Sequence, residues 1–312
     1  MRPYDRFFDD PTSGDLVRDQ APFGVLAVRG PDAVEFLHRL CSQDLTAAAP
    51  GDALPAAFLN AKGRLVATCV AGRLPDGAWL EAQAGQLDTI AELLERYHFS
   101  ERLEVQRRDW VCWEVLQPSA GSKSDTCVEL EGGGVRFTGG RHGVRWVRWH
   151  AAAAAFADAA PWSAPAPQAL STELAEAWRI CAGLVRVGED SDASTLGPEA
   201  SLDDHLSLTK GCYTGQEIVA RIDTYGHVNR RLCLLEVDTV APFEPPTMLV
   251  EPDEGDPVGR AMTSAALPDG QRRVALGYLP ADFWEPGTEL RLGDAAGPRV
   301  TVRAFEPAEE SA

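Results

Sequence analysis

The sequence predicts an α+β fold whose C-terminal part is a small antiparallel β-barrel or sandwich. Over residues 23–183, strand-like apolar runs are interspersed with segments whose apolar residues recur at helical spacing. Beyond Arg231, short apolar runs such as 232–237 and 274–279 alternate with turns rich in Pro and Gly. Short strands separated by such turns are typical of small all-β domains.

Two regions therefore follow from the sequence, 1–231 and 232–312. Residues 151–169 are rich in Ala and Pro, which indicates a linker, and we expect two interleaved subdomains within the first region. A chain of 312 residues with 45% hydrophobic residues can fill a sizeable core.

Composition argues against several classes of function. A formal net charge of −18 disfavours binding to nucleic acid, whose phosphates require clusters of Lys and Arg. No apolar run of about 18 residues is present, so we expect no membrane span. Residues 1–6 lack the apolar core of a signal peptide. We expect a cytoplasmic monomer.

Seven cysteines at irregular spacings, without a C-x-x-C pair, indicate reduced thiols and no disulfide framework. The same pattern predicts no metal site and no permanent iron–sulfur cluster on a compact thiolate motif.

The first region opens with a predicted strand at 23–28 and an amphipathic helix at 31–41, with Pro31 in its first turn. A hairpin should follow at 56–60 and 65–70, where Gly63 supplies the positive φ of the turn.

A second helix is predicted at 85–99, with an apolar face that extends from Leu87 to Tyr97. Strands are predicted at 111–116 and 144–149, with a Gly-rich loop at 132–143 between them.

Three arginines on or beside the second of these strands, Arg141, Arg145 and Arg148, are interleaved with Trp146 and Trp149. This pattern can bind anions or single-stranded nucleic acid. An exposed strand face decorated with arginines is the interpretation that the acidic composition favours.

A third helix should begin at Ser171 or Thr172, bury Trp178 and Cys181, and end at Gly183.

Residues 210–217 read K-G-C-Y-T-G-Q-E and predict a turn that leads into a helix. Thr214 and Glu217 have the spacing of a capping box, and Gly226 offers an end to the helix. Cys212 then precedes a helix N-terminus, close in sequence to Lys210, and both features favour the thiolate. The alternative is a small buried cysteine without chemistry.

The octet, continued by I-V-A-R at 218–221, resembles the signature of the YgfZ folate-binding family. That family is related to the glycine-cleavage T-protein, an aminomethyltransferase, and assists iron–sulfur cluster assembly or repair. Further matching elements are L-N-A-K-G-R at 59–64, R-I-C-A-G at 179–183 and P-E-A at 198–200. With fragments of the C-terminal barrel, the resemblance runs from about residue 23 to 303.

The resemblance implies a ring of domains around a central channel that holds tetrahydrofolate or another reduced folate, closed by a C-terminal antiparallel β-barrel. It implies Cys212 as a reactive or ligating thiol, and iron–sulfur client or assembly proteins as partners. Lys62 and Arg64 can meet the carboxylates of a folate tail. Glu199 can accept hydrogen bonds from a pterin amine or can simply stabilise a first turn. The residues expected to bind folate are Asn60, Lys62, Arg64, Arg179, Glu199, Lys210, Tyr213, Gln216, Glu217 and Arg221.

One departure from the T-protein pattern concerns function. T-proteins carry adjacent aspartates where this chain has Ala67 and Thr68, and a Glu where it has Cys181. A transfer that relies on a carboxylate beside the folate nitrogens loses that group. The sequence therefore predicts folate-dependent support of iron–sulfur proteins without aminomethyltransferase activity. The alternatives are a one-carbon transferase and a non-catalytic interaction module with structural folate.

Overall fold

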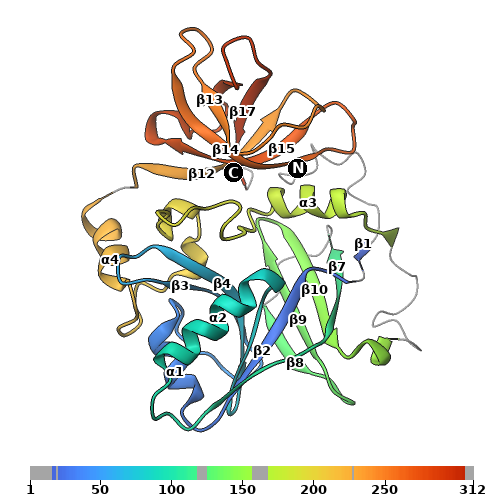
Figure 1. The fold of residues 1–312 in the computed structure, drawn as a ribbon, viewed down its shortest axis with the longest axis vertical. Coiled ribbons are helices and arrows are strands. Elements are labelled where there is room, and N and C mark those ends of the chain that lie inside the picture. The colour runs from blue at the N-terminus through green and yellow to red at the C-terminus, as the bar shows by residue number, and fades with distance from the viewer. Residues whose placement is uncertain (1–15, 19, 118–124, 157–167, 227, 306–312) are drawn as a thin grey trace, which may run out of the picture.

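The computed structural model describes residues 16–18, 20–117, 125–156, 168–226 and 228–305. Two sheets and their helices form a body, and a closed six-stranded antiparallel barrel lies against one end of it (Figure 1). The predicted α+β fold with a C-terminal barrel is confirmed. No helix in the described ranges is long and apolar enough to cross a membrane.

The first sheet is antiparallel and has the strand order β3-β4-β5-β2-β6. Two helices cover it, and their buried residues, among them Phe36 and Ile90, share one core with the strands. The predicted helical face ends at Leu94, because Tyr97 is 41% exposed. The elements are β2 (Phe23–Arg29), α1 (Ala33–Leu40), β3 (Ala53–Leu59), β4 (Leu65–Leu74), β5 (Gly77–Gln83), α2 (Ala84–Tyr97) and β6 (Glu104–Arg107).

The second sheet has the strand order β11-β1-β7-β10-β9-β8, and only its β1–β11 pair is parallel within the described residues. Its strands are β1 (Leu16–Arg18), β7 (Val111–Gln117), β8 (Thr126–Glu129), β9 (Val135–Arg141), β10 (Val144–Ala151) and β11 (Gln168–Ala169).

The prediction of a Gly-rich loop at 132–143 is wrong, because strand β9 occupies most of this range. A Cβ at Gly139 would lie 2.8 Å from Nε1 of the Trp146 indole, and one at Gly140 would lie 2.9 Å from the Arg145 guanidinium. These glycines make room for the large side chains of β10, which is a packing role within a strand.

The expectation of an exposed arginine face on this sheet is also wrong. Arg141, Arg145 and Arg148 are all buried. Arg148 donates to Glu114 at 2.7 Å and to Glu81 at 3.0 Å. Carboxylates from other strands compensate the buried charge, as a desolvated guanidinium requires.

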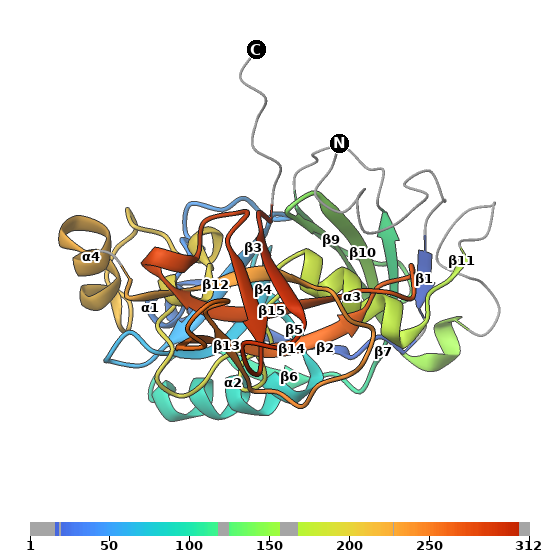
Figure 2. The same cartoon turned by 90° about the horizontal axis from the view of Figure 1, so that it is seen from above.

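Helix α3 (Thr172–Cys181) begins and ends as predicted. The Ser171 hydroxyl accepts a hydrogen bond from the backbone N–H of Leu174. Gly183 has a φ of +60°, and the backbone N–H of Leu184 donates to the carbonyl of Arg179, which is the Schellman pattern. Helix α3 lies beside the barrel strands β14 and β15 (Figures 1 and 2).

The barrel has its own apolar core and begins at Arg230, close to the boundary expected at 231/232. Whether the two regions are separate folding units stays a prediction, and the linker expected near 151–169 lies largely outside the described residues. The barrel strands are β12 (Arg230–Val237), β13 (Thr247–Val250), β14 (Pro257–Ala266), β15 (Arg273–Pro280), β16 (Glu289–Leu292) and β17 (Arg299–Arg303).

Between α3 and the barrel the chain forms two short 3₁₀-helices and one α-helix. These are η2 (Pro198–Ala200), η3 (Asp203–His205) and α4 (Gln216–Tyr225). Two further 3₁₀-helices, η1 (Ala153–Phe156) and η4 (Ala281–Phe283), lie outside this stretch.

Candidate functional site

The loop that carries Cys212 leads into α4 through a glycine. Gly215 is the N-cap residue, with a φ of +85° and no side-chain cap. The capping box predicted from Thr214 and Glu217 is therefore wrong, since the helix begins one residue later than that spacing requires. The predicted end of the helix at Gly226 is confirmed.

The glycine is required because the loop packs directly on the turn at 60–64. A Cβ at Gly215 would lie 2.6 Å from the carbonyl oxygen of Asn60, and one at Gly63 would lie 2.7 Å from Cβ of Ile218. The Asn60 side chain shapes the turn by accepting hydrogen bonds from the backbone N–H groups of Lys62 (2.9 Å) and Arg64 (3.1 Å). The turn at 60–64 and the loop at 210–217, which lie far apart in sequence, are therefore packed against each other.

Lys210 anchors the other end of this loop. Its buried ammonium donates to the carbonyls of His38, Cys41 (2.8 Å) and Gln43 (3.0 Å), at the C-terminus of α1. Burial lowers the pKa of Lys210, against the charges of Cys41 and Asp44. The prediction that Lys210 activates the thiol of Cys212 is therefore corrected, since its three N–H bonds are committed to capping a helix.

Cys212 is exposed, whereas the other six cysteines are buried. Burial raises the pKa of Cys127 and of Cys233 to about 12, and it also raises the pKa of Cys41. These buried thiols are neutral and shielded near neutral pH. Cys212 is thus the one cysteine of the chain that an external reagent, metal ion or protein can reach without unfolding.

A cleft of about 670 Å³ lies between the body and the barrel. Glu199 from η2 and Arg230 from β12 meet in it, with 3.3 Å between Oε2 and Nε. The Arg230 guanidinium lies 4.8 Å from the centroid of the Tyr278 ring. Asp192, and Arg260 and Met262 of β14, also line this cleft, which therefore combines two carboxylates, two guanidinium groups, an aromatic ring and apolar walls.

A smaller cavity, of about 70 Å³, lies between the two sheets. Thr68 lines it together with Glu81 and Arg148. Burial opposes ionisation of Glu81, but the charges of Arg148 and His150 and their hydrogen bonds outweigh it and lower the pKa of Glu81. The carboxylate in this cavity is therefore ionised and committed to Arg148 and His150.

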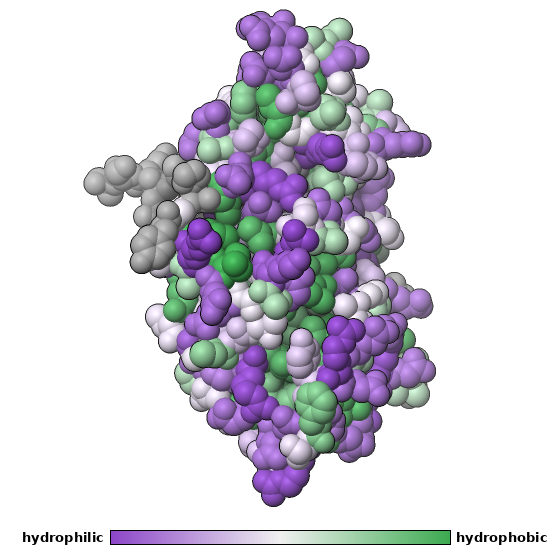
Figure 3. Space-filling model, turned by 60° about the vertical axis from the view of Figure 1, so that its left-hand side comes forward, coloured by the Kyte–Doolittle hydropathy of each residue, from purple (hydrophilic) through white to green (hydrophobic). Residues whose placement is uncertain are grey.

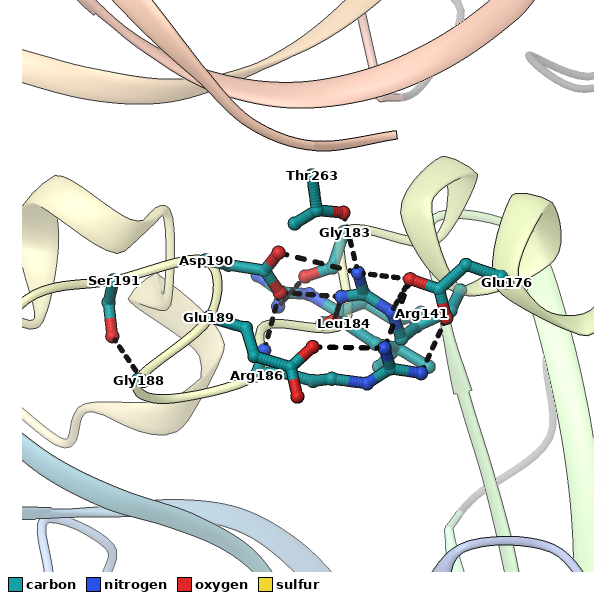
Figure 4. Close-up of polar contacts among 11 residues, drawn as sticks. Arg141, Glu176, Gly183, Leu184, Arg186, Gly188, Glu189, Asp190, Ser191 and Thr263 are labelled. Carbon is teal, nitrogen blue, oxygen red and sulfur yellow. Dashed lines mark hydrogen bonds and ion pairs between the residues drawn. The ribbon is translucent and has the colours of Figure 1, made fainter. Parts of the chain in front are cut away.

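Arg179 connects α3, the segment after it and the barrel. Figure 4 labels its partners Glu176, Asp190 and Thr263. Its guanidinium binds Asp190 at 2.6 Å, Glu176 at 2.7 Å and the hydroxyl of Thr263 at 3.0 Å. Burial opposes the charge of Arg179, and the charges of Asp190 and Glu176 raise its pKa. These contacts give Arg179 a role in joining the body to the barrel.

The structure does not bring the predicted folate residues together in one cavity. Glu199 lines the large cleft, Arg179 lines a separate cavity of about 20 Å³, and Asn60 lines a surface groove. Lys210 and Tyr213 are buried in the loop, and Gln216 is partly buried. The remaining predicted residues show no side-chain ion pair within the described residues: Lys62, Arg64, Glu217 and Arg221.

Sequence reasoning missed Arg230 and Tyr278 of the cleft. Arg230 is the first of two adjacent arginines at the start of the barrel, and Tyr278 lies in the predicted strand at 274–279. The arginine pair and the strand are both visible in the sequence, but only the folded barrel brings Arg230 and Tyr278 into one cleft with Glu199.

Comparisons with known proteins agree with this architecture. No family model matches the chain. The tRNA-modifying protein YgfZ of Vibrio vulnificus is 42% identical over 91 residues, which are 28% of this chain and 27% of that protein. The human mitochondrial iron–sulfur cluster assembly factor IBA57 is 24% identical over 305 residues, covering 91% of this chain and 82% of that protein.

The crystal structure of aminomethyltransferase T of the glycine cleavage system from Bartonella henselae matches the fold with a TM-score of 0.80. That match has 20% sequence identity and covers 94% of this chain and 86% of the other. The chain therefore has the fold of the T-protein, and its sequence is similar to YgfZ over 91 residues and to IBA57 over most of its length. The match to the T-protein fold extends from the first sheet to the barrel.

Proposed function

We propose that this protein binds tetrahydrofolate, or another reduced folate, and supports the assembly or repair of iron–sulfur clusters in client enzymes. The observation that carries the proposal is the single exposed thiol, Cys212, on a loop fixed at Lys210 and Gly215. The T-protein fold and a relative named as an iron–sulfur cluster assembly factor support it.

The cleft between body and barrel fits a folate better than the cavity between the sheets. Ligand pockets are typically about 300–1,000 Å³, a range that contains the cleft of about 670 Å³ and excludes the cavity of about 70 Å³. Glu199 would accept hydrogen bonds from the pterin amines, and Tyr278 and Met262 would contact its rings. Arg230 would hold Glu199 in place, and Arg260 would bind a carboxylate of the tail. A bound reduced folate supplies nitrogen atoms that carry one-carbon groups.

The Cys212 thiolate is a soft ligand and a nucleophile, suited to iron or to the sulfur of a cluster that a client brings. One thiol cannot hold a cluster alone, and the described residues contain no group of three His, Cys, Asp or Glu residues that could bind a metal ion. The proposal therefore assigns the remaining ligands to the client. Seven free cysteines suit a reducing compartment, and we place this role in the cytoplasm.

The alternative of an aminomethyl-type transferase requires a base beside the folate nitrogens. In the cavity between the sheets Thr68 supplies none and Glu81 is held by Arg148 and His150, and in the cleft Glu199 is paired with Arg230. This favours binding without aminomethyl transfer. In the third alternative, a pure interaction module, Cys212 has no chemical role.

Calorimetry with tetrahydrofolate tests the folate part. We expect binding to the wild-type protein and at least tenfold weaker binding to Glu199→Gln, which keeps an acceptor for the Leu196 N–H but loses the charge. Glu289→Gln, an exposed carboxylate of the barrel, is the matched control. No heat and no thermal shift at about millimolar ligand, which already corresponds to about −4 kcal/mol, would contradict the proposal. Formaldehyde release from a methylamine-loaded carrier protein would favour the transferase instead.

A further inference from the structure

We propose that a surface groove beside the Cys212 loop is the docking site for an acidic segment of the partner protein. The partner inserts one large apolar side chain into the groove. The inference rests on the proposed function, because the partner is the protein that exchanges iron or a cluster at Cys212.

The groove is continuous with the loop that carries the thiol. It has a volume of about 130 Å³, and its floor is apolar, with Leu40, Leu59, Val66 and Leu93. Thr214, two residues after Cys212, forms part of its wall. Because a cavity of about 150 Å³ can hold a benzene ring, the groove has room for one side chain of the size of Leu or Phe.

Exposed apolar side chains occur in the groove and in the chain segments next to it. Six large apolar residues are exposed among the described residues, and three of them are Tyr97, Phe99 and Leu208. Tyr97 lines the groove, Phe99 follows α2 and is 85% exposed, and Leu208 begins the Cys212 loop. Figure 3, which turns the α4 side forward, shows hydrophobic surface in green between hydrophilic side chains in purple. Apolar surface that is clustered and rimmed by polar groups marks an interaction site.

The charges around the groove select an acidic partner. Lys62 and Arg64 on the turn and Arg96 of α2 show no ion pair within the described ranges, although most arginines of the chain are paired. Glu92 lines the groove one helical turn before Arg96, and Glu217 lies three residues after Thr214, so these two carboxylates offset part of the charge of the three cations. The net charge of −18 repels an acidic segment over most of the remaining surface. Local cations within such a field orient the partner toward Cys212.

A labelled peptide in a solution of the full-length protein tests docking. The probe is a fluorescein-labelled peptide of Glu and Asp residues around one central leucine. We expect a rise in anisotropy at low salt, weakened at least tenfold by the double variant Lys62→Glu with Arg64→Glu. Arg291→Glu, at a partly exposed arginine of the barrel outside the cleft, should change peptide affinity less than twofold. Replacing the leucine of the peptide by serine should weaken binding at least fivefold.

A second peptide tests the position of the site. With an N-terminal bromoacetyl group, the acidic peptide should alkylate Cys212 at least tenfold faster than free bromoacetamide, because binding raises the local concentration of the reagent. In this step the Cys212 sulfur displaces bromide, a C–S bond forms, and the thiol proton goes to the buffer. The double variant should remove the acceleration.

Several outcomes overturn the inference. These are equal binding of the peptide in which lysines replace the acids, unchanged affinity in the double variant, equal binding of the serine peptide, or no acceleration at Cys212. Tetrahydrofolate calorimetry on the double variant separates the two proposals. Folate binding without peptide binding contradicts docking alone, and peptide binding without folate binding contradicts the folate proposal alone. A folate with a polyglutamate tail that competes for the peptide would show that the groove binds the tail and not a partner.

Discussion

The side-chain nitrogen of Lys210 donates a hydrogen bond of 2.8 Å to the carbonyl of Cys41, the residue that ends α1. The two residues are 169 positions apart in the chain. The contact ties the Cys212 loop to the first sheet and its helices, so the position of the exposed thiol depends on the core beneath it.

Lys210→Met should destabilise the protein by about 1–3 kcal/mol, because three carbonyls at the end of α1 lose their buried donor. The free energy of unfolding from urea titration measures this. Lys62→Met, at an exposed lysine close by, should change that free energy by less than about 0.5 kcal/mol. Equal effects of the two substitutions would show that the helix cap contributes nothing.

Gly215→Ala tests the contact between loop and turn. Gly215 and Gly132 both have a φ of +85°, but a Cβ at Gly132 has no neighbour within 4 Å. Gly132→Ala should therefore cost only the conformational strain, about 1–2 kcal/mol. Gly215→Ala should cost more in unfolding free energy and should also change the rate of Cys212 alkylation. If the two variants lose the same stability, the loop and the turn are not in firm contact.

Acid should weaken the contact between η3 and the second sheet. Burial opposes ionisation of Asp204, but hydrogen bonding and charge from His205, with the charge of Arg141, lower its pKa to about 2. A carboxyl group whose pKa is lower in the folded than in the unfolded protein stabilises the fold at pH values above its ordinary pKa of 3.8. This stabilisation is lost as the pH falls toward the folded-state pKa of about 2. The stability difference between wild type and Asp204→Asn should be on the order of 1 kcal/mol at about pH 6, since the carboxylate is partly exposed. It should shrink below about pH 4. A difference that is independent of pH would contradict this assignment.

The sequence predicted the elements whose signals are local. The turn at Gly63, the caps of α3 and the barrel strands follow from periodicity, glycine and capping chemistry within a few residues. The capping box at Thr214 had the correct spacing, but the approach of the Asn60 carbonyl required a glycine as the N-cap.

The errors concern side chains whose partners are distant in sequence. The sequence around Arg148 predicts an exposed side chain. In the structure Arg148 is buried, and the carboxylate of Glu81, 67 residues away in sequence, compensates its charge. The sequence similarly predicts that Lys210 acts on the nearby Cys212, whereas in the structure its ammonium is bonded to carbonyls at the end of α1. Single-sequence patterns do not show such pairs, because burial of a charge depends on the partner that the fold supplies.

The rate of alkylation of each cysteine, followed by function in cells, tests the central claim most directly. In the native protein at neutral pH, iodoacetamide should modify Cys212 well before Cys41 or Cys233, because only Cys212 is exposed. Cys212→Ser should fold as the wild type does and should fail to restore iron–sulfur enzyme activity in cells that lack this protein. Full restoration by the serine variant, or modification of Cys41 as fast as Cys212, would contradict the account.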